Sequence, residues 1–213
     1  MDCCQCQGIE REFDRKSVLE ELEDYQAGEV DKTTQWLIDA IVELDISGNS
    51  LLDIGGGVGM IQHQLLQAGV SEVVSVDAST AYYEASMEEA ERRGFADKIT
   101  FQHGNFVSLA EDLAPADIVT LDRVVCCYHD MPALLGRAAT RANRVLGLVY
   151  PRDAWWLKLG SRFANGGLRL QRNPFRVFIH PVSDIESIIH GAGFKERFAR
   201  STMFWNVRLY EKL

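Results

Sequence analysis

The stretch that most constrains this chain runs from Leu51 to Met60 and reads LLDIGGGVGM. An apolar run closes around Asp53, a cluster of glycines follows, and a helical pattern then resumes, which predicts a buried strand, a tight loop and a helix. Glycines suit such a loop because they accept positive φ and because, without a Cβ, they let a ligand lie against backbone amides at the helix N-terminus. The loop is therefore predicted to hold a ligand.

The glycine spacing separates two nucleotide-like ligands. A dinucleotide fingerprint requires Gly-x-Gly-x-x-Gly, and counting from Gly55 its last glycine falls on Met60, which disfavours a dehydrogenase. The observed pattern is an acid, Asp53, followed by glycines at alternate positions, Gly55, Gly57 and Gly59. It resembles motif I of the class I S-adenosylmethionine-dependent methyltransferases. The resemblance implies a Rossmann-like α/β fold, S-adenosylmethionine as cofactor, and a cofactor site that includes these four residues.

A second short apolar run, VVSVD, ends at Asp77, which lies 22 positions after Gly55. A carboxylate at the tip of a second strand can accept hydrogen bonds from both hydroxyls of a ribose. The resemblance gives Asp77 that role and places Ala78 beside the adenine. Alternatively, Asp77 caps the helix that follows, which is a common use of aspartate.

Composition bounds the broad class of protein. The 213 residues are 46% apolar and 25% charged, as expected for one domain with a full core. The net charge of −9 argues against a wide nucleic-acid-binding surface, because that affinity depends on clustered Lys and Arg. No run reaches the ~18 apolar residues of a membrane span, and the first residues do not form a signal-peptide pattern. We expect a cytoplasmic protein without nucleic-acid partners.

After the glycine loop, strand and helix patterns alternate, which predicts a mostly parallel sheet with helices on both faces. Two strand-like runs, from Lys195 to Met203 and from Phe204 to Glu211, predict a final hairpin. The resemblance then implies a Rossmann-like seven-stranded sheet with a C-terminal antiparallel hairpin strand and an N-terminal helical lid. The expected strands are 73–77, 98–103, 117–122 and 144–150, and the expected helices are 79–93 and 130–142.

Two helical patterns precede the first strand, and residues 1–12 show no periodicity and are expected to be a mobile tail. We therefore divide the chain into 1–46, a tail and helical cap, and 47–213, the methyltransferase domain. In the resembling family such a leading segment closes over the cofactor, which makes Tyr25 a candidate cofactor contact. The alternative, that Tyr25 packs between helices, stays open.

Later strand ends supply further candidates. The family has Gly-Asp after the third strand, where the acid accepts a hydrogen bond from the adenine amino group; here the residues are Gly104 and Asn105, and the Asn carbonyl oxygen can also accept. Phe106 would stack or pack beside the ring. The fourth strand ends at Asp122, another implied cofactor residue, and its loop would face the methyl group and the acceptor.

Tyr128 and His129 follow in that loop and are the candidates for accepting or steering a proton, since imidazole titrates near neutrality. A lone histidine before a helix is also often a surface or capping residue. Methyl transfer can proceed by alignment of the nucleophile alone, without a base. The loop does not carry the Asp/Asn-Pro-Pro-Tyr motif of enzymes that methylate nucleic-acid bases, which favours a small-molecule acceptor.

The segment 152–176 is expected to be an insert that acts as a lid. It contains Trp155 and Trp156 and six basic residues against one acid, a net +5 in a chain of −9. Such segregation is typical of pockets for greasy anionic acceptors and of faces that contact membranes. The alternative is an amphipathic helix that packs on the sheet with its basic face in solvent.

Five cysteines form neither a disulfide framework nor a spaced zinc motif, so we expect reduced thiols and no metal site. They are Cys3, Cys4, Cys6, Cys126 and Cys127. A thiol-bound arsenic acceptor is disfavoured, because adjacent cysteines on a strand would face opposite sides.

These patterns together predict an enzyme that transfers a methyl group from S-adenosylmethionine to an oxygen or nitrogen of a small or lipophilic, anionic acceptor. Within the family the chain is faintly similar to magnesium-protoporphyrin O-methyltransferases. The rival hypothesis is a non-catalytic protein that binds S-adenosylmethionine as a sensor or as a partner-stabilising subunit. A peripheral membrane contact through 152–176 is the other expected interaction.

Overall fold

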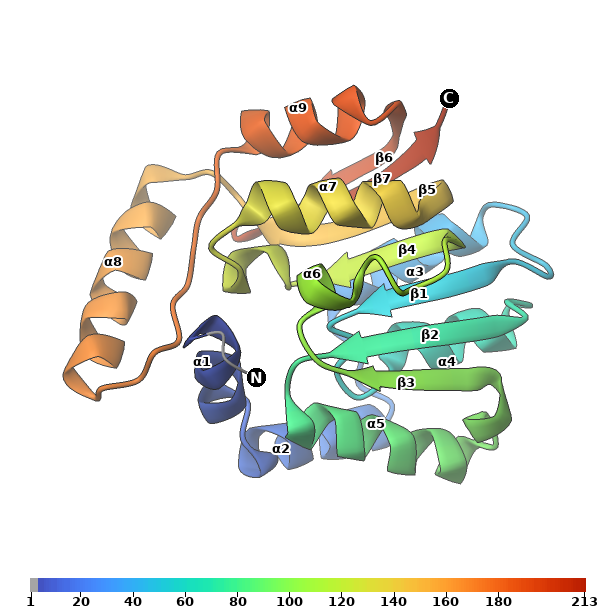
Figure 1. The fold of residues 1–213 in the computed structure, drawn as a ribbon, viewed down its shortest axis with the longest axis horizontal. Coiled ribbons are helices and arrows are strands. Elements are labelled where there is room, and N and C mark those ends of the chain that lie inside the picture. Colours follow the sequence, from blue (N-terminus) through green and yellow to red (C-terminus); the bar gives the residue numbers. More distant parts are fainter. Residues whose placement is uncertain (1–3) are drawn as a thin grey trace.

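The computed structural model describes residues 4–213, which form a seven-stranded sheet between two layers of helices (Figure 1). Five neighbouring strands are parallel, and the last two strands of the chain join the far edge as an antiparallel hairpin. In spatial order the strands are β3 (Ile99–His103), β2 (Glu72–Asp77), β1 (Ser50–Ile54), β4 (Ala116–Asp122), β5 (Ala142–Pro151), β7 (Trp205–Lys212) and β6 (Phe194–Ser201). The predicted fold class is confirmed.

The strand order reverses direction between β1 and β4. The chain moves outward from β1 through β2 to β3, then returns to the other side of β1 and continues outward through β4 and β5. Ligands of open α/β sheets bind in the crevice at such a reversal, at the carboxyl ends of the strands. The topology therefore locates a candidate site before any side chain is considered.

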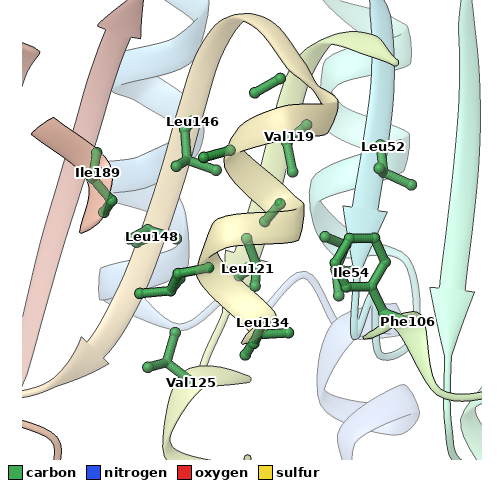
Figure 2. Packing of buried hydrophobic residues seen from close by; sticks show 14 of the residues in the cluster. Leu52, Ile54, Phe106, Val119, Leu121, Val125, Leu134, Leu146, Leu148 and Ile189 are labelled. Carbon is green, nitrogen blue, oxygen red and sulfur yellow. The ribbon is translucent and has the colours of Figure 1, made fainter. Parts of the chain in front are cut away.

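Helices cover both faces of the sheet because neighbouring residues of each buried strand point to opposite sides. Leu52 belongs to the core beneath α7 and α9, part of which Figure 2 shows, whereas Leu51 belongs to the core beneath α3 and α4. The helices are α1 (Cys4–Glu12), α2 (Arg15–Gln26), α3 (Lys32–Val42), α4 (Met60–Gln67), α5 (Thr80–Arg93), α6 (Phe106–Leu109), α7 (Met131–Arg141), α8 (Trp155–Leu170) and α9 (Val182–Gly191), with 3-10 turns η1 (Ala96–Lys98) and η2 (Val125–Cys127).

The first residues are not a tail. Residues 4–12 form α1, so the expectation of a mobile segment is wrong for them, and residues 1–3 lie outside the described part. Tertiary contacts hold this short polar helix, which explains why the sequence shows no periodicity there. Arg11 donates to the carbonyl oxygens of Arg172 (3.0 Å) and Gln171 (3.2 Å). A Cβ on Gly8 would lie 2.5 Å from the backbone nitrogen of Phe175, so the two segments touch.

Helix α2 is anchored to α5 by a buried ionic cluster. The Glu89 side chain is 1% exposed and accepts from Arg92, from Arg93 and, at 2.9 Å, from Gln26 of α2. Burial by itself would raise the pKa of Glu89, but these hydrogen bonds outweigh it and hold the pKa at about 2. The Arg93 guanidinium also lies 4.0 Å from the ring centre of Tyr25. The leading segment is therefore fixed on the sheet rather than loosely attached.

Helix α8 contains no buried residue and stands at one end of the molecule (Figure 1). The chain returns from it through residues 171–181 to α9. Among the helices of residues 4–213, none combines the length and the apolar character needed to cross a bilayer.

Candidate functional site

A cavity of about 590 Å³ lies at the carboxyl ends of β1, β2 and β4, where the topology places a ligand. The glycine loop, Asp77, Asp122 and Tyr128 contribute to its lining. Residues of α1, of α2 and of the turn between them close another side, including Cys6, Ile9, Phe13 and Glu21. The leading segment therefore covers the cavity, as expected for a helical lid.

The loop between β1 and α4 requires glycines for steric reasons. Gly57 has φ +55°, and Gly55 has φ +66°, conformations that side chains rarely adopt. A Cβ on Gly55 would lie 2.4 Å from Val124 Cγ2, and one on Gly56 would lie 2.2 Å from Gln62 Nε2. Sequence spacing identified Gly55 and Gly57 but not Gly56, which occupies an x position of the motif and has the tightest of these contacts.

Asp53 is buried in a polar row that crosses three strands. It is 1% exposed and accepts from Thr120 Oγ1 (2.6 Å) and Gln62 Nε2 (3.0 Å), and the same amide donates to Ser75 Oγ at 2.9 Å. Ser75 and Thr120 are the register partners of Asp53 on β2 and β4. Burial raises the pKa of Asp53. The carboxylate thus supports the loop from beneath while also lining the cavity.

Asp77 ends β2, is 9% exposed and lines the cavity. Its Oδ1 accepts from the backbone N–H of Ser79 at 2.8 Å, and its Oδ2 accepts from that of Gly57 at 3.3 Å. The N-cap of α5 is Ser79, whose hydroxyl accepts from Tyr82 N–H, so Asp77 does not cap the helix as the alternative had it. The contact with Gly57 ties the carboxylate to the glycine loop. Burial raises the pKa of Asp77 to about 7. Hydroxyl donors from a ligand would stabilise the ionised form and lower that pKa.

Asp122 ends β4 and has one oxygen without a hydrogen-bond partner. Its Oδ2 accepts from Thr34 Oγ1 at 2.5 Å, whereas Oδ1 is buried and unpaired apart from the Arg123 guanidinium, whose Nε is 3.9 Å away. Burial raises the pKa of Asp122 to about 6. Asp122 is among the residues that line the cavity, and its Oδ1 would fit a donor on a ligand that reached it, such as an ammonium group.

The residues predicted to surround the adenine line the cavity, but the Asn105 oxygen is already engaged in hydrogen bonds. Ala78, Gly104, Asn105 and Phe106 all line the cavity. The Asn105 Oδ1 already accepts from Val107 N–H at 3.0 Å, because Asn105 is the N-cap of α6. That oxygen also lies 3.2 Å from the Tyr128 hydroxyl, so its capacity for an adenine amino group depends on how this hydroxyl is oriented. Phe106 is 5% exposed and packs in the core beside the cavity.

The two candidate proton acceptors are placed differently. Tyr128 is 9% exposed, lines the cavity and exchanges a hydrogen bond with the Asn105 amide at 3.0 Å. His129 is exposed and does not line the cavity, and its ring stacks beside that of Tyr128 at 5.5 Å between centroids. Of the two, the geometry therefore leaves only Tyr128 in position to contact an acceptor, and His129 fits the surface alternative.

Two candidate cofactor residues lie behind the cavity wall. Tyr25 is 4% exposed, and its hydroxyl lies 3.2 Å from His63 Nδ1, so it follows the helix-packing alternative. Gly59 is the N-cap of α4 with φ +89°, and a Cβ there would lie 2.7 Å from the His63 ring. Burial lowers the pKa of His63 to about 4, which keeps the ring neutral. These contacts support the wall without reaching the ligand space.

The cysteine pair is not on a strand. Cys126 and Cys127 belong to η2, and their sulfur atoms lie 3.8 Å apart, so the expectation that they face opposite sides is wrong. A 3-10 turn rotates successive side chains by about 120°, which does not separate neighbours as a strand does. Cys127 and Cys6 both line the cavity. Even so, the described side chains, which are those of residues 6–213, contain no cluster of three His, Cys, Asp or Glu arranged to hold a metal.

The charge of the lining is strongly acidic. Seven carboxylates line the cavity, against one cation, Arg123, which is itself paired with Asp31. The acids are Glu21, Asp24, Glu29, Asp31, Asp53, Asp77 and Asp122. Such a cavity favours ligands that carry positive charge. The sequence missed most of this wall, because Glu21, Asp24 and Glu29 come from the leading segment and carry no motif.

The fold has the architecture of class I methyltransferases. Residues 51–147 match the family model of a methyltransferase domain. A solved magnesium protoporphyrin IX methyltransferase from Synechocystis PCC 6803 with bound S-adenosylmethionine aligns with a TM-score of 0.66 at 20% identity, over 90% of this chain and 83% of that one. An O-methyltransferase family protein from Burkholderia thailandensis aligns with a TM-score of 0.65 at 17% identity, over 84% and 56% of the two chains. The expected resemblance to S-adenosylmethionine-dependent methyltransferases is confirmed.

Curated relatives match over a smaller part of the chain. The ribosomal protein L11 methyltransferase of Vibrio parahaemolyticus is 31% identical over 67 residues, which are 32% of this chain and 23% of that protein. The enzyme of the same name from Desulforamulus reducens is 27% identical over 106 residues, or 48% and 34% of the two chains. The matches thus span a quarter to a third of the length of these relatives, and they do not identify the methyl acceptor.

Proposed function

We propose that this chain binds S-adenosylmethionine in the cavity and transfers its methyl group to a small or lipophilic acceptor. The observation that carries the proposal is the meeting of the glycine loop with Asp77 and Asp122 at the sheet reversal. S-adenosylmethionine supplies an electrophilic methyl group, because a positively charged sulfonium carries it. The acidic lining suits that charge, and the unpaired Asp122 Oδ1 suits the ammonium group.

Each wall residue then has a role in binding or positioning. Asp77 accepts hydrogen bonds from the ribose hydroxyls while the Gly57 and Ser79 amides hold its carboxylate in place. Gly55 and Gly57 keep the loop backbone open for the methionine portion. Tyr128 lines the cavity, and its hydroxyl would orient a nucleophile that reached it. No base is required for in-line transfer, so the rate depends mainly on how well the nucleophile is aligned with the methyl group.

The chemistry of the lining bears on the acceptor. Apolar side chains such as Ile9, Phe13 and Val30 fit a lipophilic body, which supports a lipophilic acceptor. The seven carboxylates disfavour an anionic group deep in the cavity. An anionic acceptor is therefore consistent with this site only if its negative charge stays outside the cavity. The expectation of an anionic acceptor rests on the basic residues of 152–176 alone.

Calorimetric titration with S-adenosylhomocysteine tests the binding step. Asp77→Ala should weaken binding at least tenfold, since hydrogen bonds to a charged group contribute about 1.5–3 kcal/mol each. Asp97→Ala, which removes an exposed carboxylate on η1, is the matched control and should bind like the parent. Binding of Asp77→Ala within about twofold of the parent would contradict the assignment.

Turnover separates the enzyme from its rival, a sensor or partner subunit that binds the same cofactor. Incubation of the protein with methyl-labelled S-adenosylmethionine and fractionated metabolites should yield a labelled product that Asp77→Ala fails to make. Tight binding without label transfer to any fraction would favour the non-catalytic alternative.

A further inference from the structure

Helix α8 carries large apolar side chains on the face that points to solvent. Trp155 is 76% exposed, Phe163 is 74% exposed and Leu170 is 88% exposed, with Leu159 at 44%. At about 100° per residue these four lie within an arc of roughly 80°, so they form one stripe along the helix. In a helix packed on a core, the apolar stripe faces inward. Here α8 places other apolar side chains, among them Leu157 and Leu168, in half-buried positions and leaves this stripe in solvent, which indicates that something else covers the stripe.

A second group of exposed apolar side chains lies at the end of the sheet and contacts α8 through Trp156. The ring of Trp156 meets that of Phe204 edge-on, with 5.4 Å between centroids. Phe204 is 49% exposed and Met203 is 64% exposed, and both lie in the turn between β6 and β7. The exposed apolar surface is therefore built from two segments that are distant in sequence, and it is larger than isolated surface side chains would give.

Basic side chains border the stripe on one side. Lys158, Arg162 and Arg169 are spaced i, i+4 and i+11, which puts them within roughly 60° of Trp155 on the flank away from Phe163. Arg162 and Arg169 are exposed, whereas Lys158 pairs with Asp153. An apolar stripe with a row of cations along its edge matches a helix that lies in the plane of a membrane interface.

Two other occupants fit less well. A lid over the acceptor would bring α8 to the cavity, yet none of residues 152–176 is among the residues that line it. A second copy of the chain in a two-fold dimer would place the same surface against itself, so a net +5 would oppose a net +5. An anionic lipid surface satisfies both the apolar stripe and the cations.

We propose that α8 and the β6–β7 turn dock on an anionic membrane surface, with Trp155, Phe163 and Leu170 in the interfacial layer and Arg162 and Arg169 at the headgroups. The docking does not depend on the proposed methyl transfer, because it uses side chains outside the cavity. It supplies a reason for a chain of net charge −9 to carry a net charge of +5 over residues 152–176.

Co-sedimentation of the full chain with vesicles tests the proposal. At low salt the protein should bind phosphatidylcholine vesicles that contain about a third phosphatidylserine, and it should bind pure phosphatidylcholine far more weakly. Arg162→Gln with Arg169→Gln should lower the partition coefficient about 25-fold, at about fivefold per cation. Lys98→Gln with Lys195→Gln changes the charge equally on exposed residues elsewhere and should bind like the parent.

Removal of the stripe is the second arm. Trp155→Ser with Phe163→Ser should abolish vesicle binding, while the melting temperature and the affinity for S-adenosylhomocysteine stay unchanged, because both side chains are exposed. Unchanged vesicle binding by this variant, or no binding of the parent to anionic vesicles, would overturn the proposal. So would a parent that sediments as a dimer which the same two substitutions dissociate. Loss of cofactor binding in Asp77→Ala leaves this test unaffected.

Discussion

The raised pKa of Asp77 predicts that cofactor binding depends on pH. The carboxylate is 9% exposed, and burial raises its pKa to about 7 in the free protein. Only the ionised form can accept hydrogen bonds from two ribose hydroxyls while it also accepts from Gly57 and Ser79. Binding should therefore strengthen as the pH rises through 7 and weaken as it falls below 7.

The size of the effect follows from the ionised fraction. With a pKa of about 7, Asp77 is mostly protonated one unit below that value and mostly ionised one unit above it. The ionisation of Asp77 should thus lower the affinity for S-adenosylhomocysteine about tenfold between pH ~8 and pH ~6, which corresponds to about 1.4 kcal/mol, and Asp122 adds about twofold to this fall in the parent. Binding near pH ~6 should also release close to one proton, because the ligand lowers the pKa of the carboxyl group.

Calorimetry in buffers of different ionisation enthalpy measures both quantities. Asp77→Asn should bind more weakly and should lose most of this pH dependence, keeping a dependence of about twofold that comes from Asp122, whose pKa is about 6. A parent affinity that stays within twofold across this range, or an equal slope in Asp77→Asn, would refute the reasoning.

Three further outcomes are expected. Gly56→Ala should weaken S-adenosylhomocysteine binding in calorimetry and destabilise the fold by about 1–3 kcal/mol in urea titrations, because its Cβ would lie 2.2 Å from Gln62 Nε2; parent-like values would show that the loop can relax. Glu89→Gln should cost about 3 kcal/mol of unfolding free energy at neutral pH, since the folded pKa of about 2 lies below the usual 4.5, and denaturant melts should show this loss shrinking as the pH falls towards 2. His129→Ala should keep parent turnover, because the side chain is exposed outside the cavity; a large loss of kcat would return it to the site.

Local sequence signals were sufficient where one segment determines the structure. The glycine loop, the acid at the end of β2 and the alternation of strands and helices all follow from neighbouring residues, so the sheet and its ligand end were predictable. The polar row around Asp53 could also be predicted in part. Ser75 and Thr120 each interrupt an apolar strand two positions before its end, although only the register shows that both flank Asp53.

Features that depend on packing between distant segments were not predictable. Helix α1 lacks periodicity because its contacts are with residues 171–175. The helical spacing of Tyr25 fits both a cofactor contact and packing between helices. Only its contacts with His63 of α4 and Arg93 of α5 show that it packs between helices. The direction of the apolar stripe on α8 could not be read either, since periodicity defines a face but not what lies against it.

The bonds between α1 and the connection after α8 make these two helices mechanically dependent. Arg11 and Glu12 hold residues 171–173, and the same helix supplies Cys6 and Ile9 to the cavity wall. Any tilt of α8 must therefore either pull α1 with it or break those bonds. A displacement of α8 that keeps these bonds would in that way move the part of the cavity wall that Cys6 and Ile9 form.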